Sequence, residues 1–152
     1  MLSIDELDLK ILKRIQKDGR YNLQDLSNEF RIPKSTILYR IRRMEKDGII
    51  TGYYTGINVR KLGYDYLVIT LIKSKYGKEH YDNVAKELSK LPGVWGVYFV
   101  LGNIDFIVMA RFKNREDFMT NYLNKITTIK GIQSSNTHII LDIAKDNFYE
   151  IF

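Results

Sequence analysis

Residues 33–50, PKSTILYRIRRMEKDGII, decide how the first part of this chain folds. On a helix that turns 100° per residue, Ile37, Ile41 and Met44 lie within about 40° of one another and form one apolar stripe. The opposite side carries hydroxyl, aromatic and cationic side chains: Ser35, Tyr39, Arg42 and Lys46. The pattern predicts a helix that packs on a core through one side and leaves a positively charged side in solvent.

The exposed side of this helix has the chemistry that the major groove of DNA requires. Hydroxyl and guanidinium groups read base edges, and cations contact phosphates. Two shorter helical patterns precede it, one from about Ser3 or Asp5 to Lys17 and one from about Asn22 to Phe30, so it is expected to be the third helix of a helix-turn-helix unit. The candidate DNA-binding residues are Lys34, Ser35, Thr36, Tyr39, Arg40, Arg42, Arg43 and Lys46. A solvated basic face, or an ordinary helical hairpin, is the alternative interpretation.

Local signals mark the ends of these helices. Ser3 with Glu6, or Asp5 with Asp8, is a candidate capping box for the first helix. Gly19 and Gly48 are expected to stop the first and third helices. Residues 49–54 then predict a short strand that Gly52 interrupts.

The remainder of the chain alternates strand and helix patterns. Strands are expected over residues 64–72, 94–101, 105–112 and 132–141, and helices over 80–91 and after a cap at Asn114. The order β-α-β-β-α-β is that of the ferredoxin-like arrangement, a four-stranded antiparallel sheet with helices on one face. The other face needs a cover, and a second copy of the sheet is the simplest one, so a homodimer is expected.

Composition narrows the possible functions. The chain has 152 residues and a net charge of +6 at pH 7, and residues 34–46 alone contribute +4. No cysteine is present, which excludes disulfides and thiolate metal sites and fits the cytoplasm. His80 and His138 lack further ligands at metal spacing, and neither a secretory signal nor a membrane-spanning run is expected. Nucleotide-binding and hydrolase motifs are missing, so we expect neither a catalytic residue nor a cofactor.

Four stretches together resemble the Lrp/AsnC family of transcription regulators, also called feast/famine regulatory proteins. They are LDLKIL at 7–12 with Gly19-Arg20, Arg40-Ile41 with GIITGY at 48–53, LPGV at 91–94, and GNID at 102–105. The resemblance covers nearly the whole chain. One departure is Pro33, which stands where the family usually has a serine that caps the third helix.

The resemblance implies a second domain that binds a small effector, an amino acid, and dimers that assemble further to an octamer. It places the effector site at Gly102, Asn103, Ile104 and Asp105 of the hairpin and at Ser134, Ser135 and Thr137 of the last strand. Asp105 could neutralise an ammonium group while backbone amides and hydroxyls hold a carboxylate. A turn glycine followed by an aspartate at a strand start is equally a common structural pairing.

These observations predict an α+β protein. We expect a helix-turn-helix (winged-helix-like) domain over residues 1–52, a connector strand or hinge over 53–64, and a ferredoxin-like ligand-sensing and oligomerisation domain over 65–152. The expected function is sequence-specific transcription regulation on double-stranded DNA, modulated by an amino acid. An architectural DNA-compacting protein of the same fold, without a ligand response, is the alternative. An enzyme is disfavoured because the chain has no room for a separate catalytic domain.

Overall fold

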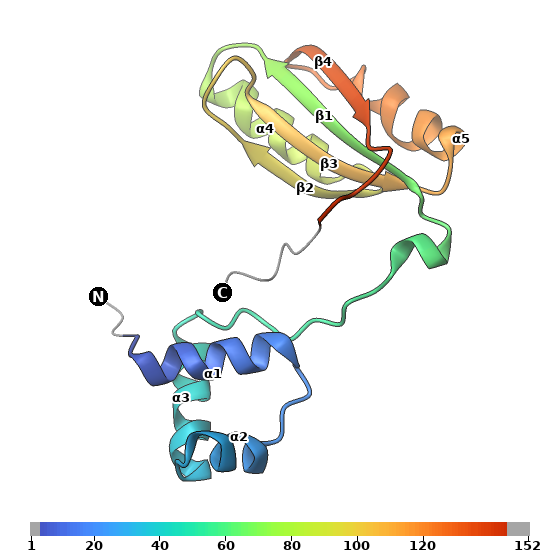
Figure 1. The fold of residues 1–152 in the computed structure, drawn as a ribbon. Coiled ribbons are helices and arrows are strands. Elements are labelled where there is room, and N and C mark those ends of the chain that lie inside the picture. Colours follow the sequence, from blue (N-terminus) through green and yellow to red (C-terminus); the bar gives the residue numbers. More distant parts are fainter. Residues whose placement is uncertain (1–3, 146–152) are drawn as a thin grey trace. The chain divides into compact units, whose positions relative to one another are not determined.

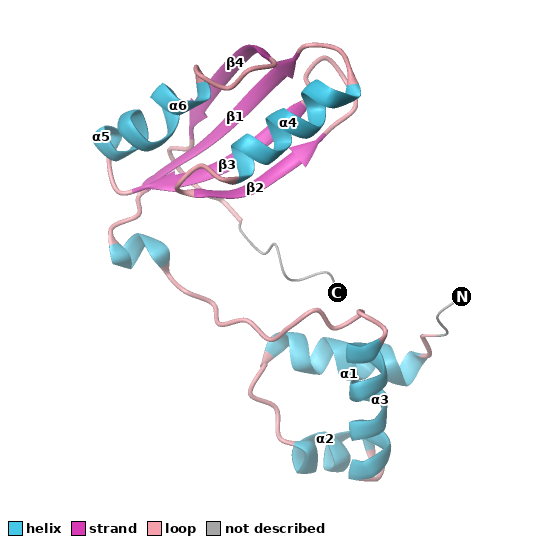
Figure 2. Ribbon diagram, turned by 180° about the vertical axis from the view of Figure 1, so that it is seen from behind, coloured by secondary structure: helices cyan, strands magenta, loops and turns pink. Residues whose placement is uncertain are grey.

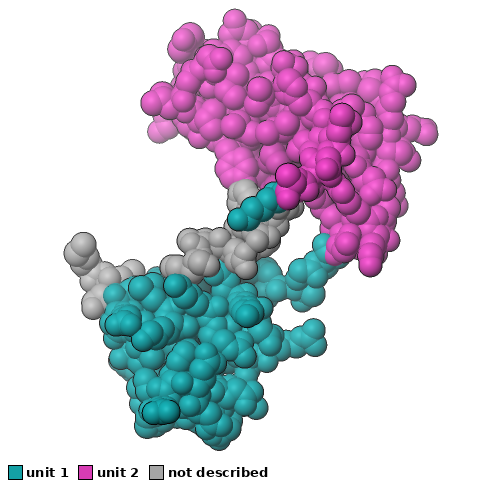
Figure 3. All heavy atoms as spheres, viewed as in Figure 1, with its two compact units in different colours: residues 1–57, 145–152 teal, residues 58–144 magenta. Residues whose placement is uncertain are grey.

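The chain forms two compact units, residues 1–57 and residues 58–144 (Figure 3). The structure is a computed structural model, and it describes residues 4–145. The division between the units falls inside the connector that the sequence predicts over residues 53–64.

The first unit is built from three helices, α1 (Glu6–Lys17), α2 (Leu23–Phe30) and α3 (Lys34–Lys46) (Figure 1). Each helix contributes its apolar stripe to one small core. The fully or nearly buried core side chains are Ile11, Ile15, Leu26, Ile37, Ile41 and Met44. The three helices and the buried stripe of α3 confirm the prediction. The amphipathic period of these segments is sufficient to predict them.

The first two helices begin at the expected capping residues. Asp5 caps α1: its carboxylate accepts the backbone N–H of Asp8 at 2.9 Å, and the Asp8 carboxylate accepts the backbone N–H of Asp5 at 3.1 Å. This reciprocal pair is a capping box formed by Asp5 and Asp8, and Ser3 of the alternative box lies outside the described residues. Asn22 caps α2 by accepting the backbone N–H of Gln24 at 2.8 Å.

The prediction of a strand over residues 49–54 is wrong. No strand of the described chain lies beside this segment, and a lone strand leaves its backbone groups without partners. The segment instead folds back on α3. The hydroxyl of Tyr53 donates to Glu45 at 2.8 Å and lies 3.2 Å from the hydroxyl of Tyr21. The connector continues into a short 3-10 helix, Val59–Leu62.

The second unit has the expected β-α-β-β-α-β order. Its strands are β1 (Tyr66–Ser74), β2 (Val94–Phe99), β3 (Phe106–Phe112) and β4 (Ile132–Ile139), and α4 (Lys78–Ser89) connects the first two. The sheet order is β2-β3-β1-β4, and every neighbouring pair is antiparallel. Seen from behind, α4, α5 (Arg115–Phe118) and α6 (Asn124–Ile126) all lie on the same face of this sheet (Figure 2). The structure therefore confirms the ferredoxin-like architecture.

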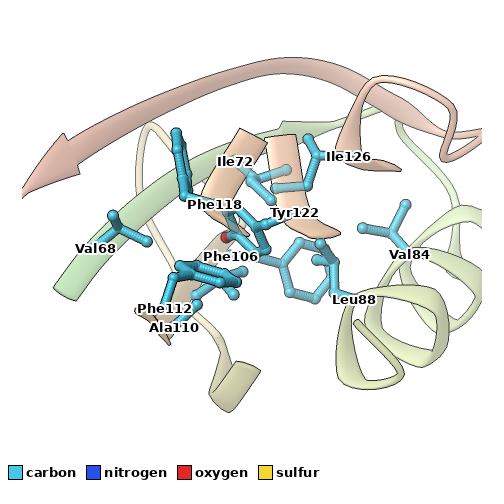
Figure 4. Packing of buried hydrophobic residues seen from close by; sticks show 11 residues of the cluster. Val68, Ile72, Val84, Leu88, Phe106, Ala110, Phe112, Phe118, Tyr122 and Ile126 are labelled. Atoms are coloured by element: carbon cyan, nitrogen blue, oxygen red, sulfur yellow. The ribbon is translucent and has the colours of Figure 1, made fainter. Parts of the chain in front are cut away.

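The two faces of the sheet differ in cover. Alternate residues of β1 and β3 point into the core under the helices, where aromatic rings fill the space between helix and sheet (Figure 4). The labelled core residues are Val68, Ile72, Val84, Leu88, Phe106, Ala110, Phe112, Phe118, Tyr122 and Ile126. On the opposite face Ile69 and Leu71 of β1 lie beside Met109 and Ile107 of β3, and all four are half-buried.

The last helical segment is not a uniform α-helix. It consists of α5 (Arg115–Phe118), a π-helical turn over Met119–Leu123, and α6 (Asn124–Ile126). The π turn carries Tyr122, which is fully buried and donates its hydroxyl hydrogen to Thr70 Oγ1 at 2.9 Å. The expected cap at Asn114 is confirmed by its bond to the backbone N–H of Asp117 at 2.9 Å.

Candidate nucleic-acid interface and effector site

The turn that positions α3 is short and held by backbone hydrogen bonds. Arg31 ends α2 in the left-handed conformation with φ 56°, and its backbone N–H reaches the carbonyl of Ser27. Pro33 stands at the cap of α3 without a side-chain hydrogen bond, and its carbonyl accepts the N–H groups of Thr36 and Ile37 at 3.0 and 3.2 Å. Proline suits this place because it has no N–H to satisfy. The helix consequently starts at Lys34.

The polar side of α3 lies open to solvent. Its exposed members are Lys34, Ser35, Tyr39, Arg42 and Lys46, and Thr36 is half-buried. The ring of Tyr39 is 68% exposed, which is a large fraction for an aromatic side chain. Within residues 4–145, no side-chain hydrogen bond or ion pair engages Tyr39, Arg42 or Lys46. Their donors are therefore available to a duplex.

Arg40 and Arg43 are placed differently from the other predicted DNA contacts. Arg40 Nη1 lies 2.5 Å from Asp5 Oδ2 and 3.0 Å from Asp8 Oδ1. Arg43 Nη2 binds the second oxygen of Asp8. The hydrogen bond from Arg40 and the backbone N–H of Asp8 lower the pKa of Asp5 to about 2. Both guanidinium groups thus join α3 to the start of α1.

Asp8 is the residue that sequence reasoning missed. Its side chain is 0% exposed, although an acidic residue in the first turn of a helix is usually a solvated one. The expected capping box included Asp8, but nothing in the local pattern predicts partners 32 and 35 residues further along.

The predicted effector residues gather at one end of the sheet in the second unit. The β2–β3 connection and the beginning of β4 both lie beside the end of β1. Asp105 is 8% exposed, and its Oδ2 accepts the backbone N–H of Ser74 at 2.8 Å. Lys73 Nζ lies 3.5 Å from the same oxygen. Lys73 was not predicted, because it is a single charged residue near the end of a largely apolar strand.

The other predicted effector residues divide into two groups. Gly102, Asn103, Ser134 and Ser135 are exposed, and Ile104 is half-buried; Ser134 pairs with Lys73 across β1 and β4. Thr137 belongs to the covered side of the sheet. Its Oγ1 lies 3.0 Å from Thr70 Oγ1, which also accepts the hydroxyl of Tyr122. The structure therefore brings Asp105, Lys73 and Ser134 together and leaves Thr137 engaged with the interior.

Burial also affects Tyr122. Removal from water raises the pKa of its hydroxyl to about 12. The hydroxyl stays protonated at neutral pH and acts as a donor to Thr70.

Among the helices of residues 4–145, none combines the length and apolar character that crossing a membrane requires.

Comparison with known proteins agrees with both units. Residues 67–149 match the family model described as the Lrp/AsnC ligand binding domain, and residues 4–51 match the winged helix-turn-helix DNA-binding model. An uncharacterized HTH-type transcriptional regulator of Pyrococcus abyssi is 36% identical to this chain, and the match covers 95% of this chain and 97% of the relative. The HTH-type transcriptional regulator FL11 of Pyrococcus furiosus is 36% identical over 94% and 93%.

Solved structures share the fold over nearly the whole length. AsnC of E. coli superposes with a TM-score of 0.87 and 28% identity, covering 95% of this chain and 96% of that one. A Neisseria meningitidis transcriptional regulator in complex with L-Met also has a TM-score of 0.87, at 22% identity, covering 95% and 94%. The chain therefore belongs to the Lrp/AsnC family and is a DNA-binding transcription regulator with a ligand-binding domain.

Proposed function

We propose that this regulator docks on double-stranded DNA through the exposed side of α3 and that an amino acid binds at the end of the sheet in its second unit. The observation that carries the effector proposal is the approach of Lys73 Nζ to Asp105 Oδ2 at 3.5 Å, beside Ser134. A free amino acid carries one ammonium and one carboxylate group, so two opposite charges and a hydroxyl complement it. The relative from Neisseria meningitidis was solved with L-Met.

The experiment for the effector is a thermal-shift screen with the common amino acids. A ligand that binds only the folded state raises its stability by mass action. The Asp105→Asn variant should lose the shift, because the amide keeps an acceptor for Ser74 but has no charge for an ammonium group. Asp82→Asn, at an exposed position of α4, is the matched control and should keep the shift. If no amino acid changes the midpoint, the sensing proposal is refuted.

Docking on DNA is tested by fluorescence anisotropy with labelled duplexes. Arg42→Gln should weaken binding to all sequences alike, because a phosphate contact carries no sequence information. Lys125→Gln, an exposed change in the second unit, should leave binding unaltered. Binding with little preference among sequences, and no response to amino acids, would favour the architectural DNA-compacting alternative.

A second copy of the chain is the proposed cover for the open face of the sheet. Ile69, Leu71, Ile107 and Met109 form a contiguous apolar centre there, which a partner sheet would remove from water. A homodimer supplies two α3 helices, which suits a palindromic operator, and further assembly to an octamer follows the family pattern. Sedimentation velocity measures the oligomeric state directly. A monomer at micromolar concentration would contradict this part of the proposal.

An amino acid can regulate such an assembly only through unequal affinity for its alternative arrangements. Sedimentation and operator binding should therefore both be measured with and without the amino acid that raises the melting temperature. A ligand that binds but changes neither quantity would not be an effector.

A further inference from the structure

The carboxylate of Asp8 is a charge held entirely inside the first unit. It is 0% exposed, and its two oxygens bind Arg40 Nη1 at 3.0 Å and Arg43 Nη2. A buried carboxylate is tolerated in a protein when it is paired and hydrogen-bonded, and removing one partner is strongly destabilising. These two arginines are therefore required by the fold at the junction of α1 and α3.

Arg40 and Arg43 occupy a different side of α3 from Arg42. Residues three apart on a helix are neighbours, so Arg40 and Arg43 point the same way. Adjacent residues point about 100° apart, which separates Arg43 from Arg42. The side chains of Arg40 and Arg43 are only 22% and 33% exposed, whereas Arg42 is open to solvent.

We propose that Asp8 is a positioning residue of the DNA-binding unit: it withdraws Arg40 and Arg43 from phosphate contact and fixes α3 on α1. The inference rests on the proposed docking through α3. Lys34, Arg42 and Lys46 then carry the docking charge of the helix. Residues 34–46 have five cations and Glu45, a charge of +4; including Asp5 and Asp8 reduces it to +2. The formal charge of this group of residues is therefore half of what the helix sequence alone indicates.

The salt dependence of DNA binding distinguishes an arginine that contacts phosphate from one that is held by Asp8. Each phosphate contact releases counterions, and its loss reduces the slope of log K against log salt by about 0.9. Arg42→Gln should reduce the slope by about this amount and leave the melting temperature unchanged. Arg43→Gln should leave the slope unchanged and lower the melting temperature of the first unit. The two variants are matched, since they make the same change at neighbouring positions.

Asp8→Asn provides a readout that a purely structural residue would not move. An amide cannot neutralise two guanidinium groups, so the freed charge should steepen the salt slope by about 0.9 for each arginine that gains a phosphate. If this variant does not fold, the Arg42 and Arg43 pair decides the matter. Arg43→Lys should recover part of the lost melting temperature, because it restores one ion pair to Asp8.

The outcomes distinguish this inference from the proposed function. Equal reductions in the salt slope for Arg42→Gln and Arg43→Gln would support docking through α3. They would refute the inference that Asp8 withdraws Arg43 from phosphate contact. A wild-type protein that ignores duplex DNA at low ionic strength, or an Arg42→Gln variant with an unaltered slope, would overturn the docking surface and the inference together.

Discussion

The hydrogen-bond chain beneath the sheet gives the sharpest prediction for the second unit. Tyr122 on the π turn donates to Thr70 on β1, and Thr70 lies 3.0 Å from Thr137 on β4. Tyr122 and Thr70 are both 0% exposed, whereas Thr137 is half-buried. The perturbations are Thr70→Val, which keeps the side-chain shape, Tyr122→Phe, which removes only a hydroxyl, and their combination.

The two single variants should differ in magnitude because they leave different groups behind. Tyr122→Phe removes one hydrogen bond but leaves Thr70 paired with Thr137, which predicts a loss of about 0.5–1.5 kcal/mol. Thr70→Val strands the buried hydroxyl of Tyr122, which adds a desolvation penalty of about 1–3 kcal/mol. In the double variant no buried hydroxyl is stranded, so its loss should be clearly smaller than the sum of the single losses.

The assay uses a natural reporter. Trp95 is the only tryptophan in the chain and lies on β2, so fluorescence excited selectively at tryptophan reports on the second unit. In a domain of this size, about 1 kcal/mol corresponds to a shift of about 4–8 °C in melting temperature. A Thr70→Val variant that is less destabilised than Tyr122→Phe, or additive losses in the double variant, would refute the reasoning.

Three further outcomes are expected. The pKa of Asp5 is lowered from 3.8 to about 2 in the folded unit, so its stabilising contribution is complete above about pH 4 and is lost as the pH falls towards 2. Far-ultraviolet circular dichroism should show this dependence. Asp5→Asn should reduce it without removing it, because the pKa values of Glu6, Glu87 and Asp117 are lowered as well. Gly93 has φ 79°, and an added Cβ would lie 2.5 Å from the carbonyl oxygen of Arg111. Gly93→Ala should therefore destabilise the second unit by more than about 1 kcal/mol by Trp95 fluorescence, whereas Gly56→Ala, which meets open space, should not. Ile41→Ala removes a core side chain worth about 2–5 kcal/mol, so DNA binding should be lost while the Trp95 transition persists; unchanged DNA affinity would contradict the assigned core.

The helices and strands were predictable where one face of an element is apolar and the other polar. Ile37, Ile41 and Met44 in α3, and Val84 and Leu88 in α4, repeat at helical spacing and are buried as expected. In each case a local period determines the local structure.

Features that depend on distant partners were not predictable in this way. The β-branched residues near Ile49 favour a strand locally, but strand formation needs a neighbouring strand, and the segment contacts α3 instead. The π turn at Met119–Leu123 leaves the apolar stripe of the helix intact, so hydrophobic periodicity does not reveal it.

The site residues also divide into those that a local pattern predicts and those that depend on distant partners. The sequence identified the exposed cations of α3 but could not distinguish Arg42 from Arg43, because the distinction depends on Asp8 in another helix. At the effector end, the residues that resemble the family motif included Asp105. They did not include Lys73, whose nearness to Asp105 arises from the pairing of β1 with β3.

The contact between Tyr53, Glu45 and Tyr21 limits how much of the connector is free to act as a tether. Hydrogen bonds of this kind are worth about 0.5–1.5 kcal/mol each, so breaking them would lengthen the tether at a cost of this order. In the proposed dimer, once one α3 has docked, tether length sets the effective concentration of the second α3 at its half-site. Tolerance to half-site spacing would then be tuned by two tyrosines and a glutamate, through the length of the connector.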